Sequence, residues 1–202
     1  MRTEVGRRKK GSSVLAGAGR LSRMYTLRFT RRLLANVSGG VDDAAAQAPT
    51  TALGDWYVAP VLAKRRPLLL CTSERSLLSV MLPAEDMDEL PEHLAVALVG
   101  VLHRLDVPRT AVAREIDAMT SGDTGAAHNR STLGSMRGLA ARAQAFLAGS
   151  SGEVDVAALY THLGEYRSRA AGPDTAAARA VALLTARPGD AGRAASTGRR
   201  RR

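Results

Sequence analysis

Two short segments hold most of the residues in this chain that could do chemistry. The first is Leu53-Gly54-Asp55-Trp56-Tyr57, where a carboxylate follows a glycine and precedes two aromatic rings. Gly54 allows a backbone turn that a side chain would strain, and Asp55 can accept backbone hydrogen bonds or pair with an arginine. Trp56 and Tyr57 should point to opposite faces of a strand. We expect a tight turn anchored by a buried Trp56, and the alternative is that Asp55 and an aromatic side chain line a binding cleft.

The second segment is Asn129-Arg130-Ser131-Thr132-Leu133-Gly134-Ser135-Met136. Asn129 and Ser131 are typical helix-capping residues. Arg130 can bind an anion beside a helix N-terminus, or pair with Asp55, which we therefore expect nearby. The residues of the two segments that form the candidate binding surface are Asp55, Tyr57, Asn129, Arg130, Ser131 and Ser135.

The sequence contains no pattern of a known catalytic or metal site, so we predict no catalytic residue, metal or cofactor. The four histidines show no HxxxH or HExxH spacing, and glycine-rich phosphate loops and GxSxG are absent. Cys71 is the single cysteine and lies in an apolar run, which excludes an intrachain disulfide and a CxxC site. An enzyme with an unrecognised site around Asp55 and Arg130 stays an alternative.

The net charge of +10 is concentrated at the two ends of the chain. Residues 1–23 hold seven Lys and Arg against one acid, and residues 153–202 hold nine against five, including Arg199 to Arg202. Residues 24–152 hold thirteen of each sign. Basic tails can bind phosphate backbones weakly and without sequence preference. A nucleic-acid-associated protein is therefore a second alternative, with the tails as its contact and no dedicated surface in the middle.

The apolar segments are too short to cross a membrane, for which about 18 uninterrupted apolar residues are needed. A basic stretch at 7–10 precedes a short apolar run, as in an export signal, but Arg20 and Arg23 interrupt it. With one cysteine and an ordinary apolar fraction, we expect a cytoplasmic protein without a membrane partner.

Hydrophobic periodicity predicts strands first and helices second. Short strands are expected at 24–30, 56–62 and 68–72, and residues 76–82 are a further strand or a short helix leading into one. The short connections favour antiparallel pairing. Pro60 cannot donate to a strand ladder, so it indicates a bulge or an edge position. Helices are expected at 31–35, 90–105, 107–119 and 130–149, with a loop at 120–128. Beyond 153, apolar residues from Val156 to Tyr166 allow a helix, and an Ala-rich helix follows over roughly 174–186. Both bring little bulky apolar surface and are expected to pack weakly or to dock only on a partner.

These elements predict an α+β fold, in which a small antiparallel sheet of three to five strands packs against three or four helices. The predicted domain covers residues 24–149. Residues 1–23 form a basic, disordered extension, and residues 150–202 form a helical, Ala-rich extension that ends in a disordered Arg-rich tail.

Several motifs in order resemble a bacterial family of small proteins known as domain-of-unknown-function family 6933. They are Thr26 to Leu34, LGDWY, LLLCTSERSLLSVMLP and NRSTLGSM, which together span roughly Met24 to Leu147. The family pattern carries Asn after LGDWY and Asn-Asp after the second motif. This chain has Val58-Ala59-Pro60 and Arg137-Gly138 there instead. The resemblance implies no established activity, and it implies that both ends of the chain are additions.

The function that these observations favour is a non-catalytic bacterial binding or accessory module. Its surface would be formed by the turns at 53–57 and 129–136, and its partner would be a protein or a small ligand.

Overall fold

The computed structural model describes residues 25–35, 49–63, 66–85, 87–120, 122–150, 153–168 and 172–186. The predicted disorder of residues 1–23 and of the Arg-rich end concerns residues outside these ranges. The described part of the chain forms an α+β fold, as predicted, with a five-stranded sheet and six helices.

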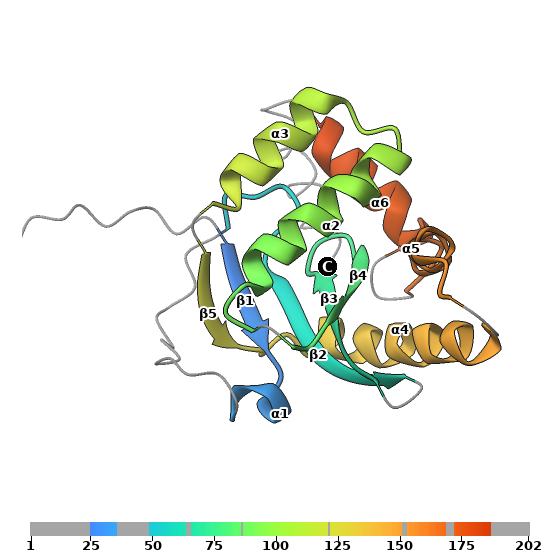
Figure 1. The fold of residues 1–202 in the computed structure, drawn as a ribbon. Helices are drawn as coiled ribbons and strands as arrows, with labels where there is room; N and C mark the ends of the chain where they lie inside the picture. Colours follow the sequence, from blue (N-terminus) through green and yellow to red (C-terminus); the bar gives the residue numbers. More distant parts are fainter. Residues whose placement is uncertain are drawn as a thin grey trace, which may run out of the picture.

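The sheet is mixed, with the strand order β4-β3-β2-β1-β5 (Figure 1). Strands β2, β3 and β4 pair antiparallel through short connections, as expected. Strand β1, however, runs parallel to both β2 and β5, so the sheet is not antiparallel throughout. Long intervening segments make this possible, because a parallel neighbour needs a crossover rather than a tight turn. The strands are β1 (Tyr25–Phe29), β2 (Trp56–Ala63), β3 (Arg66–Ser73), β4 (Ser79–Pro83) and β5 (Gly122–Ala126).

The helices follow the apolar periodicity of the sequence. They are α1 (Arg31–Leu34), α2 (Leu90–Arg104), α3 (Arg109–Ala118), α4 (Arg130–Gly149), α5 (Val156–Gly164) and α6 (Ala176–Thr185). In α2, the expected face of Leu90, Leu94, Leu98, Val101 and Leu102 is buried. Pro91 lies in its first turn, where a missing N–H group costs no helical hydrogen bond.

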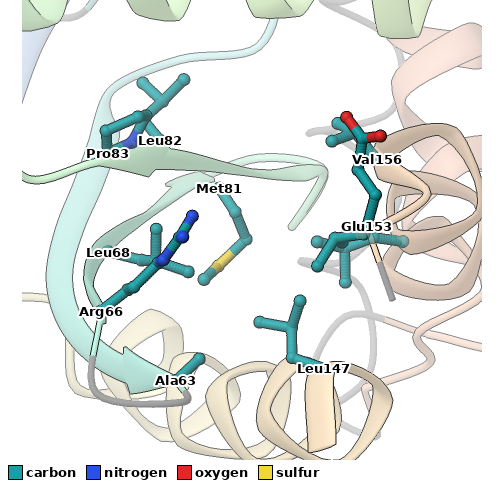
Figure 2. A pocket seen from close by; sticks show the side chains of 11 residues that line it. Ala63, Arg66, Leu68, Met81, Leu82, Pro83, Leu147, Glu153 and Val156 are labelled. Atoms are coloured by element: carbon teal, nitrogen blue, oxygen red, sulfur yellow. The ribbon is translucent and has the colours of Figure 1, made fainter. Parts of the chain in front are cut away.

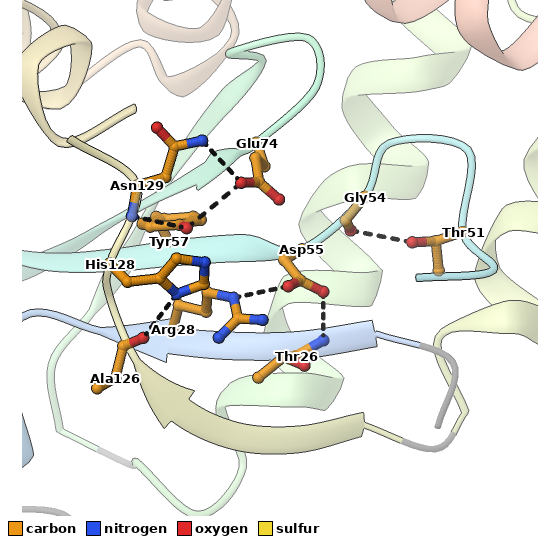
Figure 3. A network of polar contacts seen from close by, with 10 residues as sticks. All are labelled: Thr26, Arg28, Thr51, Gly54, Asp55, Tyr57, Glu74, Ala126, His128 and Asn129. Carbon is orange, nitrogen blue, oxygen red and sulfur yellow. Dashed lines mark hydrogen bonds and ion pairs between the residues drawn. The ribbon is translucent and has the colours of Figure 1, made fainter. Parts of the chain in front are cut away.

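The two faces of the sheet differ in chemistry, and the strand register shows how. Arg28, Tyr57, Thr72 and Ser79 are lateral partners on successive strands, so their side chains form one polar row on one face. Further along the same face come the apolar rows that contain Leu68 and Met81. Helix α4 packs on this face against β2 and β3, whereas α2 lies on the other side (Figures 1 and 3).

Strand β5 corrects the prediction of a loop at 120–128. Its sequence, Gly-Asp-Thr-Gly-Ala, has little intrinsic preference for a strand. The strand forms because β5 pairs with β1 along the whole length of β1, and this pairing compensates for the weak strand preference of the local sequence. A Cβ on Gly122 would lie 2.5 Å from the Tyr25 ring, so the glycine lets that ring cover the edge strand.

Helices α5 and α6 pack on the same core as the sheet, which corrects the expectation of weak packing. Tyr160 donates from its hydroxyl to the carbonyl of Met81, and Leu163 is fully buried. In α6, Ala176 and Ala180 are fully buried, and small side chains allow this close approach. Arg179 donates from Nε and Nη2 to the carbonyl of Ser76, at 3.1 and 2.8 Å. The boundary predicted at residue 149 stays a prediction.

Pro60 lies where β2 has a neighbour on one side only. Strand β1 pairs with β2 as far as Val58, whereas β3 continues alongside β2 to Ala63. The missing N–H group of Pro60 therefore costs no hydrogen bond to β1, as the predicted edge position requires.

Candidate functional site

The turn before β2 orients Asp55 toward β1. Gly54 has a φ of +78°, which a side chain would strain. Its carbonyl accepts a hydrogen bond from the Thr51 hydroxyl at 2.9 Å. Ser73 donates from Oγ to the carbonyl of Leu53 at 2.7 Å and ties the turn to β3. The glycine turn predicted from the sequence is confirmed, and it fixes the carboxylate that follows.

Asp55 forms a buried ion pair with Arg28. The Nε atom of Arg28 lies 2.6 Å from Oδ2 of Asp55, and the backbone N–H of Thr26 donates to Oδ1 at 2.9 Å (Figure 3). Asp55 was predicted to accept a backbone hydrogen bond or to pair with an arginine, and it does both. The expected partner was wrong, however, because both oxygens are taken by β1 and Arg130 is exposed to solvent.

Tyr57 connects β2 to the start of α4. Its hydroxyl donates a hydrogen bond to Oε1 of Glu74 at 3.4 Å. The same hydroxyl accepts a hydrogen bond from the backbone N–H of Asn129 at 3.3 Å. Asn129 also donates from Nδ2 to the same Glu74 oxygen at 2.9 Å. Burial, followed by the Glu74 carboxylate, raises the pKa of Tyr57 to about 12. Tyr57 is fully buried, so it supports α4 from below and does not form part of an exposed surface.

Asn129 caps α4, as predicted. Its Oδ1 accepts from the backbone N–H groups of Ser131 and Thr132, at 3.0 and 3.3 Å. One side chain therefore satisfies two free donors of the helix and binds Glu74 through its other end. We call Arg28, Asp55, Tyr57, Glu74, His128 and Asn129 the polar cluster. His128 is its exposed member, with its ring centroid 6.3 Å from that of Tyr57.

The predicted site residues thus fall into three groups. Asp55, Tyr57 and Asn129 meet in the polar cluster. Arg130 and Ser131 are exposed on the first turn of α4. Ser135 is buried one turn later, where its Oγ lies 3.1 Å from Oγ of Ser168.

Arg28 and Glu74 belong to the polar cluster but were not predicted. Arg28 is the one charged residue in an alternating strand, and a charge at such a position signals a buried partner. Glu74 lies at the turn after β3, inside the motif that carries the family resemblance. Its contact with Asn129 joins positions 55 residues apart, which no local pattern encodes.

A third carboxylate, Glu115 on α3, holds the loop before β2 from the other side. Its two oxygens accept from the backbone N–H groups of Ala52 and Leu53, at 2.7 and 3.0 Å. Burial raises the pKa of this carboxyl, while the two N–H donors and the charges of Arg75 and Arg114 act in the opposite direction.

A cavity of about 740 Å³ opens at the far end of α4, on the same face of the sheet (Figure 2). Its walls come from β3, β4, the end of α4 and the start of α5. Most lining side chains are apolar, including Leu68, Met81, Leu147 and Leu159. Arg66 and Glu153 are the charged residues of its lining, and both are exposed. Sequence reasoning missed this cavity because its walls come from elements that are distant in the chain.

Within the described ranges, no group of three or more His, Cys, Asp or Glu side chains is placed to hold a metal ion. In the same ranges, no helix is both long enough and apolar enough to cross a membrane.

The fold and the site together define a class of protein: an α+β domain whose sheet carries the polar cluster and an apolar cavity at opposite ends of one helix. The family model described as "Domain of unknown function (DUF6933)" matches residues 26–171. The chain belongs to this family, as the motifs indicated. The match extends past the end of α5, beyond the Leu147 limit of the motif resemblance. Comparison with curated proteins finds no match.

Proposed function

We propose that this domain is a non-catalytic binding module that takes a small, mainly apolar ligand in the cavity between β3, β4, α4 and α5. The cavity itself is the observation that carries the proposal. Its volume of about 740 Å³ lies within the range of small-molecule sites in proteins, and its apolar lining with few charged groups is typical of them.

The polar cluster supports a structural role rather than a catalytic one. Both oxygens of Asp55 accept hydrogen bonds, and so do both oxygens of Glu115. With a pKa of about 12, Tyr57 keeps its proton at neutral pH and serves as a donor to Glu74. General acid–base catalysis instead favours a group whose pKa lies near the working pH.

The two motif segments fit this proposal as the support of the cavity. Asn129 fixes the beginning of α4 against β2 and β3, and Leu147 near the other end of the same helix forms part of the cavity wall. Along its side, Gln144 donates to the carbonyl of Leu62, which anchors α4 to the projecting end of β2. The position of the cavity wall therefore depends on the polar cluster.

Calorimetric titration of the full chain with neutral alkanols tests this function. Octanol, decanol and dodecanol should bind with affinity that rises about fourfold for each methylene that is buried. Val156 is half-exposed and lines the cavity, so Val156→Trp should block it. Val96→Trp is the matched control, because Val96 is exposed on α2. Equal alkanol binding by both variants, or no binding by the native protein, would overturn the proposal.

The first turn of α4 is a second candidate, as a protein-contact surface. Arg130 and Ser131 are exposed there, and they follow Asn129, whose position is fixed by the polar cluster. Affinity capture from the native host should recover a protein with the native chain and with Arg137→Glu, whose position is also exposed on α4, but not with Arg130→Glu. Recovery of the same proteins with all three chains would exclude this surface.

A further inference from the structure

We infer that the ligand of the cavity is a free single-chain amphiphile with a carboxylate head group, and that Arg66 binds this head. The inference rests on the proposed function, because it specifies the ligand of the same site. Three properties of the cavity carry it: the apolar lining, an arginine at one side whose side chain has no partner among the described residues, and the position of the one acidic lining residue at the other.

The apolar lining accounts for the hydrocarbon part of the ligand. Leu68 and Met81 come from the sheet, Leu147 from α4, and Val156 with Leu159 from α5. Hydrogen-bonding side chains are nearly absent from this lining, so a ligand body rich in polar groups would lose its hydration without replacement. A hydrocarbon chain has no such groups and gains from burial.

Arg66 accounts for the charge of the head group. It begins β3 and lines the cavity, and its side chain forms no hydrogen bond or ion pair with another described residue. Figure 2 shows its guanidinium directed over the cavity from the β3 side. In the sequence, Arg66 directly follows Lys64 and Arg65, so this part of the chain brings three positive charges. A planar guanidinium can bind both oxygens of a carboxylate.

Glu153 sets the orientation of the ligand. It enters from the opposite side, ahead of α5, and forms no ion pair with Arg66 (Figure 2). Its carboxylate repels an anion, so the head group is expected on the Arg66 side. Neutralising Glu153 should therefore strengthen binding of a carboxylate, while neutralising Arg66 should weaken it.

The test compares three probes with the same hydrocarbon chain and different heads: dodecanoate, dodecanol and dodecyltrimethylammonium. Each is titrated into the full chain by calorimetry, the two charged probes below their micelle concentrations and dodecanol below its solubility limit. The native protein should bind dodecanoate best. Arg66→Gln should weaken dodecanoate binding about fivefold, the effect of one solvent-accessible ion pair, and leave dodecanol unchanged. Glu153→Gln should strengthen dodecanoate binding and weaken the ammonium probe.

Two controls separate the cavity from the basic ends of the chain. Acetate carries the same carboxylate head without the hydrocarbon chain. Any heat of binding measured with acetate therefore comes from contact with the charge alone. Val156→Trp keeps every positive charge and blocks the cavity, so it should abolish dodecanoate binding, whereas Val96→Trp should not. Circular dichroism and thermal melting of each variant confirm that it folds.

The outcomes are distinct. If all three probes bind equally and Arg66→Gln changes nothing, the apolar site stands and the carboxylate preference is overturned. If no probe binds, or Val156→Trp binds them as well as the native chain, the proposed function itself fails. If the protein binds phosphatidylglycerol vesicles but no dodecanoate monomer, the ligand is a membrane surface and the inference is overturned.

Discussion

Arg28 and Asp55 form an ion pair of 2.6 Å between β1 and the turn that begins β2, and less than a tenth of either side chain is exposed. The register places Arg28 opposite Tyr57 on β2, so the pair lies beside the hydroxyl that binds Glu74 and Asn129. The contact thus joins the parallel part of the sheet to the start of α4.

Asp55→Asn should destabilise the protein by about 3–5 kcal/mol, because it leaves the Arg28 charge buried without a partner. Urea unfolding followed by Trp56 emission measures this, since Trp56 is the single tryptophan and is fully buried. Glu89→Gln is the control, because Glu89 pairs with His93 on the surface at 3.5 Å and should cost less than about 1 kcal/mol. Equal losses in the two variants would contradict the importance of the buried pair.

Glu115 should make stability depend on pH. Burial raises the pKa of its carboxyl above the ordinary value of 4.5, so the folded state holds the proton more tightly than the unfolded state. The free energy of unfolding therefore falls as pH rises from about 4.5 through the raised pKa, and then levels off.

Glu115→Gln should remove this part of the pH dependence, and urea midpoints at a series of pH values would measure it. The amide also leaves one backbone N–H of residues 52 and 53 without an acceptor, so the whole curve should lie lower. Glu92→Gln is the matched control, because Glu92 is exposed on α2 and should keep the native slope. If Glu115→Gln shows the same pH dependence of the free energy of unfolding as the native protein, another group is responsible for that dependence.

Arg179→Ala should loosen α6 from the sheet. The change removes two hydrogen bonds from a charged donor to the carbonyl of Ser76 and should cost at least about 1.5 kcal/mol. Hydrogen exchange should become faster at the amides of α6 while those of α2 stay protected. Arg137→Ala provides the comparison, because Arg137 is exposed on α4 and should leave exchange in α6 unchanged.

If the basic ends bind nucleic acid, deletion of residues 1–23 and 193–202 should abolish retention on heparin or DNA at low salt. Together these ends carry all of the excess positive charge, and binding through them should weaken steeply as salt rises. Chromatography of the full and shortened chains over a salt gradient measures the difference. If the shortened chain is still retained, the nucleic-acid contact lies within residues 24–192.

The sequence predicted best where one local pattern decides the outcome. The apolar spacing of α2 identifies its buried face, Gly54 predicts a turn with positive φ, and Asn129 predicts a helix cap. Each of these depends on residues within a few positions of one another.

The predictions failed where distant residues decide. The composition of β5 favours a loop, and only its alignment with β1 makes it a strand. The two motifs predict Arg130 as the partner of Asp55, whereas parallel pairing of β1 with β2 brings Arg28 to it. The cavity has no sequence signal, because it is the space left between β3, β4, α4 and α5.

The position of β1 between β2 and β5 also has a consequence for synthesis of the protein. Leu27 pairs with Trp56 on one side and with Thr124 on the other. As a ribosome releases the chain, one edge of β1 has no native partner until β5 has emerged, nearly a hundred residues later. An open strand edge is prone to pair with other chains, and long-range pairing of this kind is slow. The nascent domain is therefore expected to be most vulnerable to aggregation before β5 is complete.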